Sequence, residues 1–90
     1  MRAIRAIVRG QVQGVYFRAF TRDEAVKLGV TGWVRNNPDG SVECFAQASE
    51  DKIEAFVRFL HQGSPGARVA SVQTRDDTPQ PRLKAFEIRY

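Results

Sequence analysis

Residues 30–48 read VTGWVRNNPDGSVECFAQA, and this stretch carries the strongest evidence for the fold. The segment Asn37-Pro38-Asp39-Gly40 is typical of a tight turn, because proline presets its own φ and glycine accepts a positive φ. Residues 30–36 and 42–48, on either side of it, are rich in residues that favour strands. In the second run, one face consists of Val42, Cys44, Ala46 and Ala48. The stretch therefore predicts a β-hairpin.

A helix is predicted on each side of this hairpin. Before it, residues 17–28 follow helical spacing and stop at Gly29, a residue suited to the left-handed end of a helix. The side chains expected to face inward are Phe17, Phe20, Ala25 and Leu28. After it, Ser49 is expected to cap a helix that ends at Gly63. The apolar stripe of this second helix consists of Ile53, Phe56, Val57 and Leu60.

Strands are expected at both ends of the chain. Residues 4–12 alternate, and their inward set is Ile4, Ala6, Val8, Gly10 and Val12. Residues 69–75 and 86–90 predict closing strands, joined by a proline-containing connection. The order strand, helix, hairpin, helix and strands is the split βαβ pattern. The sequence therefore predicts an α+β, ferredoxin-like βαββαβ sandwich: an antiparallel sheet of four to five strands, with two helices on one face and the other face open to solvent.

Length and composition narrow the class of protein. A chain of 90 residues, 42% apolar and 27% charged, predicts a single globular domain spanning residues 1–90. One cysteine cannot form an internal disulfide, which favours a cytoplasmic location. Residues 1–11 lack the continuous apolar run of a signal peptide, and no membrane association is expected. The formal charge of +4 favours anionic partners.

Most catalytic constellations are absent from the sequence. One histidine and one cysteine give no dyad and no metal cluster, so no metal site is expected. We expect His61 at a solvated helix end and Cys44 in the core. Asp76 and Asp77 are neighbours on a strand and point to opposite faces, which makes them a poor acid/base pair.

The connection over residues 10–18 is the main candidate for an anion site. The start of a helix leaves backbone N–H groups unpaired, and Gly14 lets the chain curl toward a ligand. Arg18 lies in the first helical turn, where its guanidinium can bind the same anion with two hydrogen bonds. Asn36, at a strand end, offers an amide that can orient water. By themselves, these residues also fit a plain strand-to-helix loop and an asparagine that initiates the hairpin turn.

Two segments together resemble a known family. Residues 12–18, VQGVYFR, and residues 32–36, GWVRN, followed by DGSVE at 39–43, resemble the signature segments of the acylphosphatases, small hydrolases of carboxyl-phosphate anhydrides. The resemblance extends over essentially the whole chain and implies a monomer with no metal or organic cofactor. It places the phosphate-binding arginine on Arg18 and the water-orienting asparagine on Asn36. It places the cradle of backbone amides on Gln13, Gly14, Val15, Tyr16, Phe17 and Arg18.

The favoured hypothesis is therefore an enzyme that hydrolyses a small-molecule acyl phosphate to a carboxylate and inorganic phosphate, with no nucleic-acid partner. One alternative is a non-catalytic module that binds single-stranded nucleic acid on the open sheet face. Its residues would be Arg5, Arg9, Trp33, Arg35 and Phe45. The domain also resembles the acylphosphatase-like segment of larger carbamoyl-transfer maturation proteins, which the free-standing length disfavours. A finer hypothesis pairs the Tyr90 carboxylate with Arg18.

Overall fold

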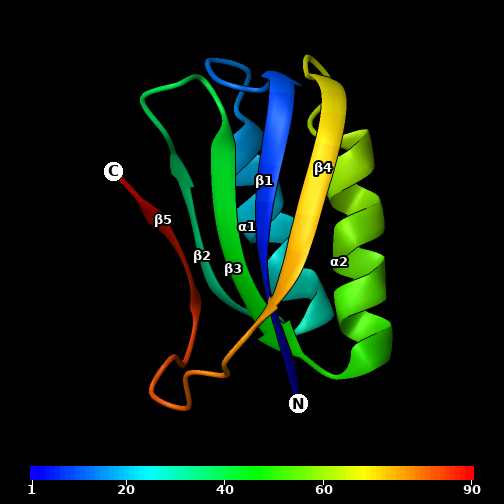
Figure 1. Cartoon of the computed structure of the whole chain (residues 1–90), viewed down its shortest axis with the longest axis vertical. Helices are drawn as coiled ribbons and strands as arrows, with labels where there is room; N and C mark the ends of the chain where they lie inside the picture. The colour runs from blue at the N-terminus through cyan, green and yellow to red at the C-terminus, as the bar shows by residue number, and fades with distance from the viewer.

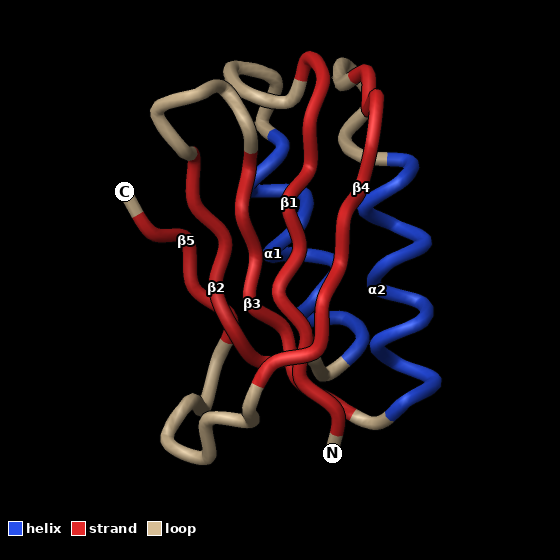
Figure 2. Tube along the Cα trace, in the orientation of Figure 1, coloured by secondary structure: helices blue, strands red, loops and turns tan.

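The computed structural model describes residues 1–90, and its strands form one five-stranded sheet in the order β4-β1-β3-β2-β5 (Figure 1). Along the chain the elements are β1 (Arg2–Gln11), α1 (Phe17–Leu28), β2 (Thr31–Asn36), β3 (Val42–Ala48), α2 (Glu50–Gln62), β4 (Arg68–Asp77) and β5 (Phe86–Arg89). Both helices lie on the same face of the sheet (Figure 2). The predicted α+β, ferredoxin-like sandwich is confirmed.

The prediction of a fully antiparallel sheet is wrong for one pair of strands. β1 is antiparallel to β3 and β4, and β2 is antiparallel to β3, but β2 and β5 are parallel. The connection between β4 and β5 carries the chain from one edge of the sheet to the other, so β5 starts beside the start of β2 (Figure 1). Side-chain alternation assigns residues to faces but carries no information about strand direction.

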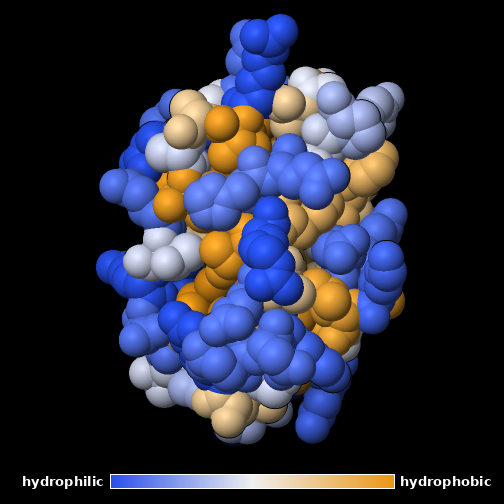
Figure 3. Space-filling view, turned by 90° about the vertical axis from the view of Figure 1, so that its right-hand side faces the viewer, coloured by the Kyte–Doolittle hydropathy of each residue, from blue (hydrophilic) through white to orange (hydrophobic).

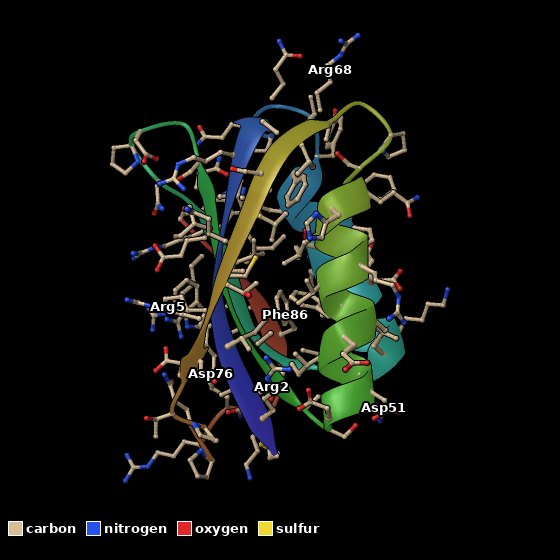
Figure 4. The ribbon with its side chains drawn as sticks, turned by 45° about the vertical axis from the view of Figure 1, so that its right-hand side comes forward. Arg2, Arg5, Asp51, Arg68, Asp76 and Phe86 are labelled. Atoms are coloured by element: carbon tan, nitrogen blue, oxygen red, sulfur yellow. The ribbon has the colours of Figure 1, made fainter.

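The core lies between the sheet and the helices, as the alternation predicts. The predicted inward residues of β3 are buried there, with Ile53, Phe56 and Leu60 of α2 packed against them. Phe86 points into this layer, whereas Arg5 lies on the other side of the sheet (Figure 4). Gly10 departs from the predicted inward set of β1, because it is exposed at a bulge between β1 and β4, with a φ of 128°.

One inward prediction for α1 is wrong. Phe17 and Ala25 are buried as expected, but Phe20 is 43% exposed and Thr21 is fully buried in its place. The buried stripe follows the i, i+4 positions 17, 21 and 25, which leaves residue 20 at the margin of the stripe. Hydrophobicity favoured the phenylalanine, whereas the position on the helix selects the threonine.

The sheet face without helices is only partly open to solvent, which corrects the prediction of an open face. Trp33, Phe45 and Gln47 of this face are all buried. The guanidinium carbon of Arg5 lies 5.2 Å from the centre of the Trp33 ring. Those of Arg35 and Arg89 lie 5.3 and 5.1 Å from it. The chain between β4 and β5 covers the rest, because Gln47 exchanges two hydrogen bonds with the backbone of residue 80. Cation–π contacts and a loop therefore replace solvent over β2 and β3, whereas Arg9, Gln73 and Arg75 on the same face remain exposed.

Glu43 holds two arginines of this face in place. Its carboxylate accepts hydrogen bonds from Arg5 and Arg35, each at 3.1 Å. Burial by itself would raise the pKa of Glu43, but the hydrogen bonds from Arg35 and Arg5 outweigh it and hold the pKa below its usual value. The carboxylate is therefore charged at neutral pH and occupies two of the guanidinium groups.

The outer side of the helical layer is polar. The side of the molecule that carries α2 is mainly hydrophilic, with smaller hydrophobic areas between charged side chains (Figure 3). This distribution matches the amphipathic pattern of α2. Neither helix has the length and the apolar character that crossing a membrane requires.

Candidate active site

The β1–α1 loop, the β2–β3 hairpin and the α2–β4 loop lie at the same end of the molecule (Figure 1). Beside the first two lies a cavity of about 410 Å³. Its lining residues are Val12, Gly14, Tyr16, Phe17, Arg18, Ala19, Asn36, Ile88 and Tyr90. The fold therefore brings Arg18 and Asn36 together with three of the predicted cradle residues. The other two cradle residues, Gln13 and Val15, do not line the cavity.

The β1–α1 loop is curled by two left-handed residues. Gly14 has φ 75° and Tyr16 has φ 59°, whereas Val15 between them has a negative φ. Alternation of this kind turns successive N–H groups toward a common concave side, which favours an anion. The backbone N–H groups of residues 14–19 donate to no acceptor in the protein, and the first intrahelical bond runs from Phe20 N to Tyr16 O at 3.1 Å. The loop thus carries a row of backbone donors without a partner, and five of these six residues line the cavity.

Contacts on both sides hold this loop. The Gln13 side-chain amide donates to the carbonyl oxygens of Asn37 and Ser41, at 2.8 and 2.9 Å, and so joins the loop to the hairpin. On the other side, the Ser64 hydroxyl donates to the carbonyl oxygen of Val15 at 2.8 Å. Gln13 and Val15 therefore position the loop through a side chain and a carbonyl group. Sequence analysis missed Ser64, which lies in the α2–β4 loop and carries no local signal of this contact.

Asn36 lines the cavity with a side chain that makes no hydrogen bond to the protein. Its Oδ1 atom is buried and has no hydrogen-bond partner in the protein. The polar groups of the hairpin turn are satisfied by other residues, because Asp39 accepts from the Ser41 backbone and hydroxyl at 2.9 and 2.6 Å. Asn37 Nδ2 donates to the same hydroxyl at 3.1 Å. Since the Asn36 side chain makes no bond within the turn, turn formation does not account for it.

Arg18 is the one charged residue among those that line the cavity, and no carboxylate pairs with it. The hypothesis of an ion pair with the Tyr90 carboxylate is wrong. Instead, the guanidinium carbon lies 4.8 Å from the centre of the Tyr90 ring, and Nη1 makes a long hydrogen bond of 3.5 Å to the Arg89 carbonyl. An aromatic ring contacts the face of a guanidinium and leaves its N–H edges available, so Arg18 remains able to bind an anion.

The other titratable residues singled out from the sequence lie away from this cavity. Cys44 is buried in the core, as predicted, and burial raises the pKa of its thiol so that it stays protonated. His61 is exposed near the end of α2, also as predicted. Asp76 accepts a hydrogen bond from Arg2 and Asp77 accepts one from Arg5. The structure contains no group of three or more His, Cys, Asp or Glu side chains arranged to hold a metal ion.

Comparisons with known proteins bear on the family of this chain. Residues 4–88 match the family model described as acylphosphatase. An acylphosphatase from Rubrobacter xylanophilus is 43% identical over 86 residues, which cover 96% of this chain and 78% of the relative. The crystal structure of acylphosphatase from Bacillus subtilis superposes with a TM-score of 0.95 at 38% identity, covering all of both chains. The crystal structure of T. kodakarensis HypF is 31% identical and superposes with a TM-score of 0.86. The match covers all of this chain and 12% of the HypF chain.

Proposed function

Since the chain belongs to the acylphosphatase family and hydrolyses acyl phosphates, we propose how its own residues carry out that reaction. The β1–α1 loop and Arg18 hold the phosphoryl group, and Asn36 orients the water that attacks it. The observation that carries the proposal is the meeting of three features at one cavity: free backbone donors, a guanidinium with no carboxylate partner, and the Asn36 side-chain amide, which makes no hydrogen bond to the protein.

The binding step uses charge and fixed geometry. A phosphoryl group spreads its negative charge over its equatorial oxygens in the transition state, and fixed N–H donors stabilise that charge. The N–H groups of residues 14–19 supply such donors at the positive end of α1. Arg18 adds a planar pair of N–H groups from the first turn of the same helix. Hydrogen bonds from Gln13 and Ser64 hold the loop in this form before substrate arrives.

The hydrolytic step needs no acidic side chain for the leaving group. Water oriented by the Asn36 side-chain amide attacks phosphorus in line, the bond from phosphorus to the acyl oxygen breaks, and the electron pair leaves with a carboxylate. The conjugate acid of that carboxylate has a pKa of about 4, so it departs unprotonated at neutral pH. The proton of the water passes to an oxygen of the phosphoryl group, which yields inorganic phosphate. No carboxyl, histidine or lysine side chain lines the cavity, which is consistent with this route.

We further propose that the chain acts as a cytoplasmic monomer on a small molecule, without a metal or organic cofactor and without nucleic acid. Two arginines of the helix-free sheet face support the last point. Arg5 and Arg35 are paired with Glu43 and stacked on Trp33, so they are not free to bind phosphates of a nucleic acid. The comparisons likewise give the nucleic-acid alternative no support.

The test is a hydrolysis assay with EDTA present, using acetyl phosphate, benzoyl phosphate and glycerol 3-phosphate. The acyl phosphates should be turned over, and the alkyl ester, whose alkoxide leaving group needs a proton, should not. Arg18→Ala should lower kcat/KM by roughly 10³-fold or more, and Arg18→Lys should not restore it, because an ammonium cannot reproduce the planar fork. Arg22→Ala on the same helix, which removes only an exposed pair with Asp23, is the matched control. Near-normal activity of either Arg18 variant would refute the assignment.

A further inference from the structure

Two exposed tyrosines flank the cavity. Tyr16 is 80% exposed and Tyr90 is 99% exposed, although both line the same hollow as Arg18 and Asn36. Aromatic side chains are usually at least half buried, because their large apolar surface gains free energy on leaving water. In the free protein neither ring gains this stabilisation. Both therefore retain apolar surface that a ligand in the cavity can cover.

Tyr16 is held in an unfavourable backbone conformation. Its φ of 59° makes it the one residue other than glycine with a positive φ, and this region disfavours bulky side chains. The curled loop requires a left-handed residue at position 16, and glycine or asparagine would meet that requirement with less strain. The tyrosine side chain therefore carries a cost that neither packing nor a hydrogen bond in the protein offsets.

The cavity is larger than the phosphoryl group requires. Its volume of about 410 Å³ lies within the range of roughly 300–1,000 Å³ that pockets for small organic ligands occupy. A phosphoryl group, with its few heavy atoms, fills only the part beside the loop donors and Arg18. The remaining lining is mostly apolar and includes Val12, Ile88 and the two tyrosines. No second charged side chain lines it, so a charged acyl group would find no partner there.

The position of Tyr90 relative to Arg18 links the two parts of the cavity. Its ring centre lies 4.8 Å from the guanidinium carbon, so the ring stands directly beside the group proposed to hold the phosphoryl oxygens. The acyl group is attached to the phosphoryl group through a single oxygen. When the phosphoryl group is bound, an acyl group therefore lies within contact distance of the apolar lining.

We propose that Tyr16 and Tyr90 form an acyl-group subsite that selects acyl phosphates with an uncharged, aromatic acyl group. The inference rests on the proposed function, because it requires the phosphoryl group to bind at Arg18 and the loop. It adds what the phosphoryl-binding residues cannot supply, which is discrimination between one acyl phosphate and another. Offset or edge-to-face contact between the tyrosine rings and the acyl group supplies the selectivity.

The test compares kcat/KM for benzoyl phosphate and acetyl phosphate in the parent protein and in Tyr90→Ala, Tyr90→Phe and Tyr16→Asn. The ratio of the two values is the readout, because differences in intrinsic reactivity between the substrates cancel between variants. Tyr90→Ala should lower the benzoyl-to-acetyl ratio about 3- to 10-fold, the effect of losing one aromatic pair. Tyr16→Asn, which tolerates the left-handed backbone, should lower it similarly. Tyr90→Phe should keep the parent ratio.

The exposed residue Val26, on α1 outside the cavity, provides the control variant Val26→Ala, whose ratio should equal that of the parent. If Tyr90→Ala lowers kcat/KM for both substrates by the same factor, Tyr90 acts only through Arg18 and the subsite is refuted. An unchanged ratio in Tyr16→Asn would remove Tyr16 from the subsite. If the parent protein hydrolysed neither substrate, the proposed function itself would fail, and this outcome is distinct from a failure of the subsite.

Discussion

Ser64→Ala tests whether the β1–α1 loop must be held for the phosphate site to work. Ser64 is 3% exposed, and its hydroxyl donates a hydrogen bond to the Val15 carbonyl oxygen at 2.8 Å. Alanine removes the donor and leaves that carbonyl oxygen without its partner. A buried polar group left unpaired costs about 1–3 kcal/mol. The matched control is Ser71→Ala, on the exposed strand β4, where the serine side chain makes no hydrogen bond to the protein.

Two measurements separate where this free energy is lost. If Ser64→Ala lowers the free energy of unfolding of the whole domain, Tm should decrease by about 4–8 °C for each kcal/mol, as expected for a domain of this size. If the loss falls only on the curled form of the loop, Tm stays close to the parent value and inhibition by inorganic phosphate weakens, about tenfold for each 1.4 kcal/mol. A Ser64→Ala protein that matches Ser71→Ala in both Tm and phosphate inhibition would refute the reasoning.

Three further predictions concern the site and its support. Asn36→Ala should lower kcat while inorganic phosphate inhibits as before, because the amide orients water; steady-state kinetics that show only weaker phosphate inhibition would reassign the residue to binding. Thr21→Val should raise the free energy of unfolding by about 1 kcal/mol in urea titrations, because it replaces a buried hydroxyl that has no partner; a lower value would mean that the hydroxyl is bonded. The Glu43 pKa is depressed in the folded state, so its stabilising contribution is complete above the unfolded pKa of about 4.3 and is lost as pH falls through the folded value. Glu43→Gln should therefore flatten the fall in stability below about pH 4.3 in thermal melts, and an unchanged acid profile would contradict this.

The parts of the fold that the sequence predicted are those governed by local chemistry. The segment Asn37-Pro38-Asp39-Gly40 is compatible with few conformations other than a tight turn. Alternation along β3 assigns its residues to the two faces of the sheet, and this requires no knowledge of the neighbouring strands. The stripe of α2 is equally local. Direction is not local: β5 is parallel to β2 because the chain crosses to the far edge of the sheet, and no residue of β5 encodes that path.

In the candidate site too, the sequence predicts the residues that lie on one short segment but not the contacts between distant segments. Arg18 and Gly14 lie on one short segment, so their shared role could be inferred from the start of a helix. Ser64 supports that segment from a distant loop, and only the tertiary structure reveals the contact. The arginines of the helix-free face, which suggested the alternative of a nucleic-acid-binding module, show the same limit of local information. Their charge suggested a ligand, but a buried Glu43 and a buried Trp33, which lie on neighbouring strands, already engage them.

The most direct test of the phosphate cradle is a titration of the ¹⁵N-labelled protein with inorganic phosphate, followed by two-dimensional NMR of the backbone amides. The account predicts that the largest shifts fall on the N–H groups of residues 14–19, which have no acceptor in the protein. Arg18→Ala should weaken the titration without changing which amides respond. Large shifts elsewhere, with residues 14–19 unmoved at saturating phosphate, would contradict the claim that this loop holds the phosphoryl group.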